Sequence, residues 1–403
     1  MNKSKYFTGQ PVFTQLLSLI PKEYVSSLAN RYSANKYCKK FMAWDHLVTM
    51  LYAGFFQCTS LREVETGMLA NGERLRHLGL QNSPARSTLS DANKRRSVDF
   101  FGDLYHMLYK HYFSPDSRSL KKEDKLFIVD STTVSLFSEI MRGAGVKKIN
   151  GKKKGGCKTH VLLDAENDLP AYVYMSEAKE HDLTFLPKID LPSGSTIVMD
   201  KAYINYRQFQ AWTDNKVRWV TRLRNNSYYA IQSQNQVAEL GAKEGVRSDV
   251  NAVLGRPSNH KVSPLVKARI VTYYDNEKNR EFEFITNDFD SDAFEIACIY
   301  KRRWQIEMLF KRIKQRYPLK YFLGDNPNAI KIQIWCALIC DLLVKIVQKQ
   351  VNSKRLRKWS YANLSGMIKH HLMTYVNLIP FLMEPDKTFK IYRPPEEQLS
   401  LFR

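Results

Sequence analysis

The segment "KLFIVDSTTVSLF" (125–137) marks the point where the chain changes from helical to β-rich sequence. Its apolar run ends at Asp130, and "STIVMDKAY" (195–203) repeats the pattern with an apolar run that ends at Asp200. Short apolar runs rich in Val and Ile are typical of strands that are buried on both faces. We therefore expect two buried strands, each carrying an acid at the edge of the sheet, where clefts form.

The neighbouring segments predict a mixed sheet. The stretch 158–177 reads as two strands around a turn at 166–168, and a helix near 205–214 precedes a strand at 217–224. Hairpin strands followed by alternating elements favour an α/β fold with helices packed on a mixed sheet.

The segment between this sheet and the next helix is polar at first and then strand-like. It spans residues 225–288 and ends in a predicted hairpin at 267–287. We interpret it as a β-rich insertion.

Residues 1 to about 120 are predicted to be helical, with segments near 11–29, 43–57, 61–69, 88–96 and 98–113. Capping boxes are predicted at Ser60 with Glu63 and at Thr88 with Asp91. The second box opens a basic helix, which fits a helix-turn-helix whose helix 88–96 contacts DNA. An ordinary solvated helix fits this stretch equally well.

The composition favours a polyanionic partner. Among 403 residues, 62 Lys and Arg against 40 Asp and Glu leave a formal charge of +22. No stretch is long and apolar enough for a membrane span, no secretory signal is evident, and the six cysteines show no paired framework. We expect a cytoplasmic protein that binds DNA and not a membrane.

A third acid stands alone in a basic stretch, "YKRRWQIEMLFKRIK" (300–314). Read as a helix, this stretch places Tyr300, Arg303, Glu307 and Lys314 within an arc of roughly 60°. One face would present the acid and its basic neighbours while the adjoining apolar face packs on a core. The alternative is an exposed helix in which Glu307 pairs locally with Arg303 and Lys311.

The three acids suggest a metal site. Two ionised carboxylates at the ends of adjacent strands need a compensating charge, and a divalent cation supplies it. With Glu307 from a helix, Asp130 and Asp200 would form the oxygen ligand set that Mg²⁺ or Mn²⁺ prefers. The alternative for each aspartate is a strand-end cap or a turn former.

The spacing of Tyr300, Arg303, Glu307 and Lys314 resembles the YREK signature of the insertion sequence 4 family of bacterial DDE transposases. The motifs "DSTTVSL" and "DKAY", at Asp130 and Asp200, are similar to the other two catalytic motifs of that family. The stretches at 42–68 and 86–96 resemble the helical region before the catalytic domain in one branch. The resemblance covers about residues 10–350.

The resemblance implies an α/β, RNase H-like catalytic core, a mixed sheet flanked by helices, with a β-rich insertion and an all-helical N-terminal DNA-binding region. The expected division is 1–120 for the DNA-binding region, 121–224 and 289–350 for the two parts of the core, 225–288 for the insertion and 351–403 for a C-terminal tail.

The resemblance also implies roles for single residues. Asp130, Asp200 and Glu307 would be catalytic and would ligate two Mg²⁺ ions, with Mn²⁺ as a substitute. DNA would be bound by Tyr300, Arg303 and Lys314, and we add Tyr203, from the DKAY motif, and Arg222, at a strand end near the acids. No nucleotide cofactor is expected.

The expected function is cut-and-paste transposition. The protein would bind the terminal inverted repeats of its element as a homodimer, cleave there, and join the 3′-hydroxyls to target DNA in the bacterial nucleoid. The alternatives are a stand-alone Mg²⁺-dependent RNase H-like nuclease and a DNA-binding protein without catalysis. A base flipped at the transposon end would stack on an aromatic side chain, for which the candidates are Trp219, Tyr228, Tyr229 and Trp304.

Weaker signals lie near the predicted strand ends. Lys158, His160, His181 and Asp182 could line the cleft, although a strand residue and a helix cap are simpler interpretations. The lysine-rich stretch at 147–154 reads as a tether that DNA could order.

Overall fold

The computed structural model describes residues 9–113, 125–135, 156–257, 264–317, 319 and 321–386. The chain divides into two compact units. A helical unit contains residues 1–112 and 313–403, and an α/β unit contains residues 113–312. The lysine-rich stretch at 147–154 lies outside the described residues.

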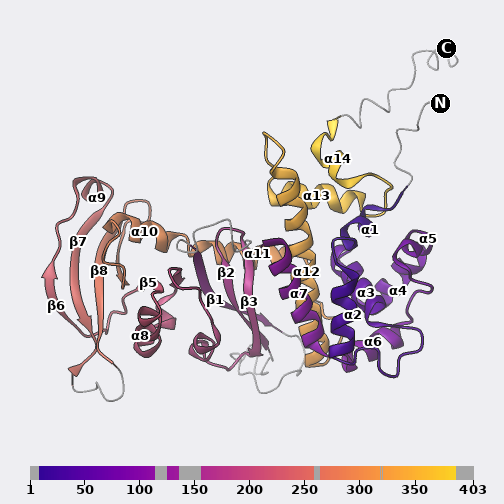
Figure 1. The fold of residues 1–403 in the computed structure, drawn as a ribbon, viewed down its shortest axis with the longest axis horizontal. Helices are drawn as coiled ribbons and strands as arrows, with labels where there is room; N and C mark the ends of the chain where they lie inside the picture. Colours follow the sequence, from indigo (N-terminus) through magenta and orange to yellow (C-terminus); the bar gives the residue numbers. More distant parts are fainter. Residues whose placement is uncertain are drawn as a thin grey trace, which may run out of the picture. The chain divides into compact units, whose positions relative to one another are not determined.

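The α/β unit is built on one sheet of nine strands in the order β3-β2-β1-β4-β5-β9-β8-β7-β6 (Figure 1). The first five strands in this order form a mixed sheet. In it, β1 (Leu126–Ser135), β4 (Thr196–Met199) and β5 (Arg218–Arg222) run parallel to one another. The strand β2 (Gly156–Asp164) runs antiparallel to both of its neighbours, β1 and β3 (Leu169–Glu177).

The β-rich insertion extends this sheet. Its strand β9 (Arg280–Thr286) pairs with β5, and β8 (Val266–Asp275), β7 (Val246–Leu254) and β6 (Tyr229–Gln234) follow in turn. The helix α9 (Glu239–Lys243) lies between β6 and β7 in the chain. The predicted hairpin at 267–287 is confirmed as β8 and β9, because the two strands pair antiparallel through a turn in which Asn279 has a φ of 49°.

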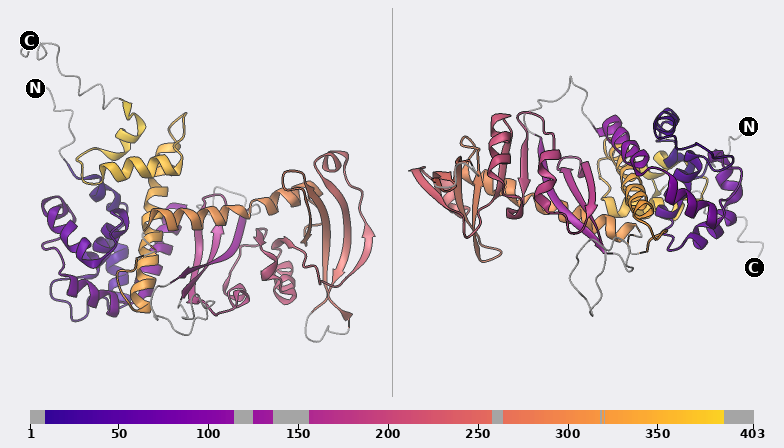
Figure 2. Two further views of the ribbon diagram at one scale, coloured as in Figure 1. Left: turned by 180° about the vertical axis from the view of Figure 1, so that it is seen from behind. Right: turned by 90° about the horizontal axis from the view of Figure 1, so that it is seen from below.

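The sheet has an apolar layer on both faces. On one face, Val129, Ile197 and Trp219 pack with Phe209 from α8 (Tyr206–Asp214). On the other face, the helix α10 (Ala293–Lys301) covers the sheet (Figure 2). The ring of its Tyr300 lies 4.7 Å from that of Phe284 in β9. The helix α11 (Trp304–Arg316) follows α10 after a short turn.

This mixed sheet flanked by helices is the RNase H-like arrangement that the resemblance implies, so the expected fold class is confirmed. The strand prediction at 195–203 was too long. The strand β4 ends at Met199, because Asp200 accepts a hydrogen bond from the backbone N–H of Ala202 and begins the 3₁₀ helix η5 (Lys201–Tyr203).

The reading of 300–314 as one helix was also wrong. The helix α10 ends at Lys301, Arg302 caps it, and α11 begins at Trp304. Arg303 therefore lies in the turn between two helices, where its backbone N–H donates to the carbonyl of Tyr300.

The helical unit packs its N-terminal helices around the 26-residue helix α12 (Pro327–Asn352). Asn326 caps α12 and Pro327 occupies its first turn, which is the favoured arrangement for starting a helix. The other helices of this unit are α1 (Val12–Leu17), α2 (Lys22–Arg31), α3 (Ala43–Phe55), α4 (Leu61–Ala70), α5 (Gly72–Leu75), α6 (Arg86–Arg95), α7 (Val98–Phe113), α13 (Tyr361–His371) and α14 (Leu378–Met383).

The capping predictions had mixed outcomes. Ser60 caps α4 by accepting a hydrogen bond from the backbone N–H of Glu63, as predicted. The box at Thr88 was wrong, because α6 begins at Arg86 and Thr88 lies inside it. The segment 11–29 is two helices, since Pro21 precedes the first residue of α2.

All six cysteines are free, in line with the lack of a paired framework. Among the described residues, no helix combines the length and apolar character needed to cross a bilayer.

Candidate active site

Asp200, which follows the carboxyl end of β4, lies beside Asp130 in the middle of the adjacent parallel strand β1. Val129 of β1 is opposite Met199 of β4, so the next residue on each chain is the aspartate. Neighbouring strands lie about 4.8 Å apart. The two apolar runs are adjacent strands, a pairing that the sequence left open.

Asp130 is a buried carboxylate in surplus negative charge. Its pKa is raised to about 6, mainly by burial and also by the nearby carboxylates of Asp200 and Glu307. Two contacts oppose this effect: the backbone N–H of Ser131 donates to Oδ1 of Asp130 at 2.8 Å, and Arg303 lies 3.4 Å from Oδ2. The site therefore disfavours a full set of ionised acids unless a cation is close.

Asp200 is better compensated. Burial acts to raise its pKa, but hydrogen bonds from the backbone N–H of Ala202 and from Arg222 outweigh burial, and the pKa is lowered. Arg222, at the end of β5, donates to Oδ2 of Asp200 at 2.9 Å. The guanidinium of Arg222 lies over the ring of Tyr300, 5.8 Å from its centroid, which fixes it beside the acid.

Glu307 reaches the same edge from the first turn of α11. Arg303 joins it to the strand acids, because its guanidinium lies 2.5 Å from Oε1 of Glu307 and 3.4 Å from Oδ2 of Asp130. Only 16% of the Arg303 side chain is exposed. The sequence left two alternatives for Glu307, a local ion pair with Arg303 or a place beside the strand acids. The structure combines both, because Arg303 contacts Glu307 and Asp130.

A guanidinium thus lies where a cation is expected among the three acids. Within the described part of the chain, no group of three or more His, Cys, Asp and Glu side chains is close enough together to hold a metal ion. Arg303 accounts for this spacing between Asp130 and Glu307, since its side chain lies between them. The donor set itself fits Mg²⁺ or Mn²⁺, because all three groups are carboxylates and their negative charge exceeds the positive charge that one Arg303 supplies.

Two arginines that sequence reasoning missed fix α11 over the sheet. Arg312 donates to the side chain of Asp168 and, at 2.9 Å, to its carbonyl. Arg302 donates to the carbonyl of Ala165 at 3.4 Å. Both acceptors belong to the turn between β2 and β3, where Asp168 has a φ of 52°. The only sequence signal was the number of arginines beside Glu307.

The other predicted site residues lie in three different settings. Tyr300 ends α10 and is 9% exposed, and Tyr203 is 1% exposed within the core. The hydroxyls of both are buried, that of Tyr203 near Ser131 and that of Tyr300 near Arg222. Lys314 lies on α11 in the part that belongs to the helical unit, and its side chain is exposed.

The four aromatic candidates for base stacking differ in exposure. Trp219 is fully buried in the core of the sheet and cannot stack on a base from this position. Trp304 is 59% exposed and Tyr228 is 48% exposed, while Tyr229 is half-buried. Trp304 directly follows Arg303 in the chain.

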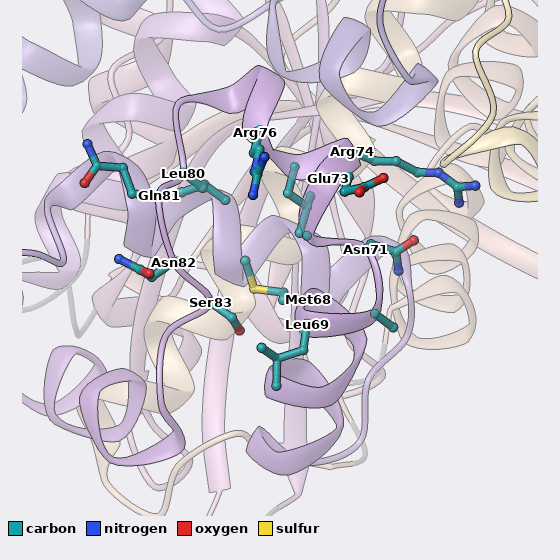
Figure 3. Close-up of a pocket in the computed structure, with 13 residues that line it drawn as sticks. Met68, Leu69, Asn71, Glu73, Arg74, Arg76, Leu80, Gln81, Asn82 and Ser83 are labelled. Carbon is teal, nitrogen blue, oxygen red and sulfur yellow. The ribbon is translucent and has the colours of Figure 1, made fainter.

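The helical unit contains a separate hollow of about 420 Å³ (Figure 3). Residues 68–76 and 80–83 line it, and Figure 3 shows the side chains of Glu73, Arg74, Gln81 and Asn82 around it. None of its lining residues is a predicted site residue, so it adds nothing to the carboxylate site.

Comparisons with known proteins identify the family of this chain. Residues 121–343 match the family described as "Transposase DDE domain", and residues 8–81 match a domain of unknown function, DUF4372. The transposase y4zB of Sinorhizobium fredii is 30% identical over 271 residues, which cover 66% of this chain and 72% of the relative. A Synechocystis transposase, from the insertion sequence element IS4SA, is 26% identical over 286 residues, covering 68% and 76%.

A solved structure of the piggyBac transposase synaptic complex with hairpin DNA aligns with 98% of this chain and 82% of that chain, with a TM-score of 0.45 and 11% identity. The family match, by contrast, spans more than half of the chain and contains Asp130, Asp200 and Glu307. The chain therefore belongs to the insertion sequence 4 family of DDE transposases, enzymes that cleave DNA and transfer its strands.

Proposed function

We propose that Asp130, Asp200 and Glu307 are the catalytic carboxylates of this transposase. The observation that supports this assignment most directly is the shared edge: Asp130 and Asp200 follow paired residues of two parallel strands, and Arg303 contacts both Asp130 and Glu307. Acids with perturbed pKa values that converge at a sheet edge are typical of a functional site.

A divalent metal is a requirement of the DDE family, and we propose that this enzyme uses two Mg²⁺ ions, with Mn²⁺ as a substitute. When bound, such ions activate a water or a 3′-hydroxyl for attack on a phosphodiester and stabilise the leaving oxygen. Asp130, Asp200 and Glu307 would hold them. The raised pKa of Asp130, caused by burial and by its two acidic neighbours, supports a site with room for added positive charge.

The basic residues would then divide into two roles. Arg222 keeps Asp200 ionised and in place, because it donates to Oδ2 of that residue and is held against Tyr300. Arg303 and Lys314 would contact DNA phosphates, Arg303 after leaving its two carboxylates. For Tyr203 and Tyr300 we propose packing roles behind the acids, because both side chains are buried and DNA would not reach them.

The N-terminal helical region is proposed to bind the transposon ends. On α6, the side chains of Arg86, Lys94 and Arg95 are exposed and would meet phosphates, Arg95 after leaving Asp91, with which it pairs at 3.2 Å. Arg96, in contrast, is buried, and it donates to the carbonyls of Ala34 and Phe41, so it holds the fold together. The formal charge of +22 supports DNA binding that weakens steeply with salt.

We propose the complete reaction as cut-and-paste transposition. A homodimer would hold two inverted repeats, cleave them by hydrolysis, and join the 3′-hydroxyls to target DNA on the bacterial nucleoid. Both steps are in-line phosphoryl transfers in which no protein side chain becomes covalently attached. Trp304 is the candidate to stack a flipped base, because it is exposed and adjoins Arg303.

The test uses Glu307→Gln, with Glu295→Gln as a matched control. Glu295 is an exposed glutamate on the neighbouring helix α10. With Mg²⁺ and DNA that carries the inverted repeats flanking the gene, Glu307→Gln should reduce both cleavage and joining to background while end binding stays near the wild-type level. The control should retain both activities. Unchanged cleavage in Glu307→Gln would reject the assignment, and cleavage without joining in the wild type would favour a nuclease.

A further inference from the structure

A second polar cluster lies at the same edge of the sheet as the carboxylates, on the opposite face. It consists of Ser131 in β1, Lys158 and His160 in β2, and Asp182, the first residue of the 3₁₀ helix η3 (Asp182–Thr184). We call these four residues the Asp182 cluster. Ser131 is opposite His160 in the β1–β2 ladder, so their side chains share one face of the sheet. Asp130 is one residue earlier and faces the other side.

Asp182 is the centre of this cluster. Its Oδ1 accepts a hydrogen bond from Oγ of Ser131 at 2.7 Å and one from Nζ of Lys158 at 3.2 Å. Lys158 also donates to the carbonyl of Glu180 at 2.9 Å, and its side chain is 14% exposed. The ammonium of Lys158 is therefore engaged by the protein and is poorly placed to meet a phosphate.

His160 forms the inner wall of the cluster. It is fully buried, its Nε2 is 3.0 Å from Oγ of Ser176, and its Nδ1 is 3.7 Å from Oδ1 of Asp182. Its ring stacks on that of Phe185, with centroids 5.3 Å apart. Packing of this kind fixes the distance between η3 and the sheet, so Asp182 has little freedom to move.

Ser131 links the cluster to the carboxylate site. Its backbone N–H donates to Oδ1 of Asp130 at 2.8 Å, while its hydroxyl donates to Asp182. Ser131, the residue after Asp130, is thus held by Asp182 on the face of the sheet opposite to the Asp130 carboxylate. A change at Asp182 would release the Ser131 side chain and, with it, the backbone N–H that orients Asp130.

We propose that Asp182 is a positioning residue that holds the middle of β1 through Ser131, so that Asp130 is oriented to bind a divalent cation. This inference rests on the proposed function, in which Asp130 is a metal ligand. Groups that orient a ligand from behind are worth roughly 10- to 100-fold in metal affinity or activity. Asp182 is not itself a ligand in this arrangement, because it faces away from the helix that carries Glu307.

The experiment compares three single variants: Asp182→Asn, Ser131→Ala and Asp164→Asn. Asp164 is the matched control, since it is a buried aspartate at the opposite end of β2, where it accepts hydrogen bonds from the backbone N–H groups of Glu166 and Asn167. Free Mn²⁺ is followed by electron paramagnetic resonance during titration of the full-length protein. The same proteins are tested for binding to inverted-repeat DNA, melting temperature and Mg²⁺ dependence of cleavage.

Asp182→Asn and Ser131→Ala should each weaken Mn²⁺ binding by about 10- to 100-fold and raise the Mg²⁺ concentration needed for half-maximal cleavage, with DNA binding unchanged. The double variant should be no worse than the worse single variant, because both changes break one link. Asp164→Asn should lower the melting temperature and leave Mn²⁺ binding unchanged. If Asp182→Asn does not fold, Ser131→Ala carries the same prediction.

Wild-type Mn²⁺ affinity in Asp182→Asn or in Ser131→Ala would overturn the proposal, as would additive losses in the double variant. The variant Asp130→Asn separates a failure of the proposed function from a failure of the positioning role of Asp182. If that variant still binds Mn²⁺ as the wild type does, the ligand assignment is wrong. If it loses Mn²⁺ while folded Asp182→Asn keeps it, only the positioning role is wrong.

Discussion

Replacing Arg303 with methionine should tighten metal binding even though it removes a residue from the active site. The guanidinium of Arg303 lies 3.4 Å from a carboxylate oxygen of Asp130 and 2.5 Å from one of Glu307. A cation that binds these two acids must displace the guanidinium or bind beside it. Methionine is similar in length and carries no charge, so Arg303→Met removes this competitor and leaves the carboxylates in place.

The expected gain follows from these distances. An ion about 2.1 Å from a carboxylate oxygen would lie about 4 to 5 Å from a guanidinium that stays in contact with that carboxylate. The repulsion between a divalent and a univalent charge at about 5 Å is ~2 kcal/mol even with the dielectric constant of water. Since 1.4 kcal/mol is a factor of ten, the variant should bind Mn²⁺ at least about 10-fold more tightly than the wild type.

The assay is calorimetric titration of Mn²⁺ into the DNA-free protein, with Arg218→Met as the control. Arg218 lies at the other end of β5, where it pairs with Asp288 at 3.5 Å, so its loss changes the net charge equally but far from the three acids. Saturating Mn²⁺ should also raise the melting temperature of Arg303→Met by more than that of the wild type, because ligand binding to the folded state stabilises it.

Two results would refute this reasoning. Equal or weaker Mn²⁺ binding in Arg303→Met would mean that Arg303 helps the acids to bind metal and does not compete with it. An equal gain in Arg218→Met would mean that the effect comes from net charge and not from the guanidinium between Asp130 and Glu307. DNA cleavage by Arg303→Met should fall despite the tighter metal binding, since the proposed phosphate contact is lost.

Two further predictions concern stability. Asp249→Ala should lower the free energy of unfolding, measured by chemical denaturation, by about 3 to 5 kcal/mol, because the buried guanidinium of Arg269 loses the carboxylate that it contacts at 2.7 Å. Replacing both residues by apolar ones should cost less. Equal losses in the single and the double variant would contradict the pairing. Burial lowers the pKa of His46 from 6.5 to about 3, so between these two pH values the unfolded state binds a proton that the folded state does not bind. The free energy of unfolding therefore decreases as the pH falls from 6.5 to about 3, by at most about 5 kcal/mol. His46→Gln should flatten this part of the pH profile of unfolding, while His77→Gln, at an exposed site, should not.

The strands at Asp130 and Asp200 could be predicted from sequence, because the pattern that indicates them lies within a few consecutive residues. An apolar run that ends in an acid predicts a buried strand that ends at a carboxylate, and Asp200 follows β4 as expected. The prediction was wrong for Asp130, because β1 continues to Ser135 and pairs with β2 on both sides of this acid. The pairing of these strands was only a hypothesis, because strand order depends on contacts far apart in sequence. The parallel register of Val129 with Met199 is such a contact, about 70 residues apart in the chain.

The two arrangements that sequence did not predict are also non-local. Periodicity placed Tyr300, Arg303 and Glu307 on one helix face, but the chain leaves the helix at Arg302 and starts another at Trp304. That break lets Arg303 contact Asp130 as well as Glu307. The expected separate β-rich insertion joins the core sheet through β9 and β5, a pairing that strand propensity alone cannot predict.

The middle of β1 shows why the site needs support from both faces of the sheet. Side chains alternate along a strand, so Asp130 faces the helix that carries Glu307 and Ser131 faces Asp182. Neither residue could do both, because a shift of one residue would exchange the two faces. The same alternation lets a buried hydrogen bond to Ser131 act on Asp130 without competing for its carboxylate. Any substitution that changes the register of β1 against β2 should therefore disturb the metal ligand and its support together.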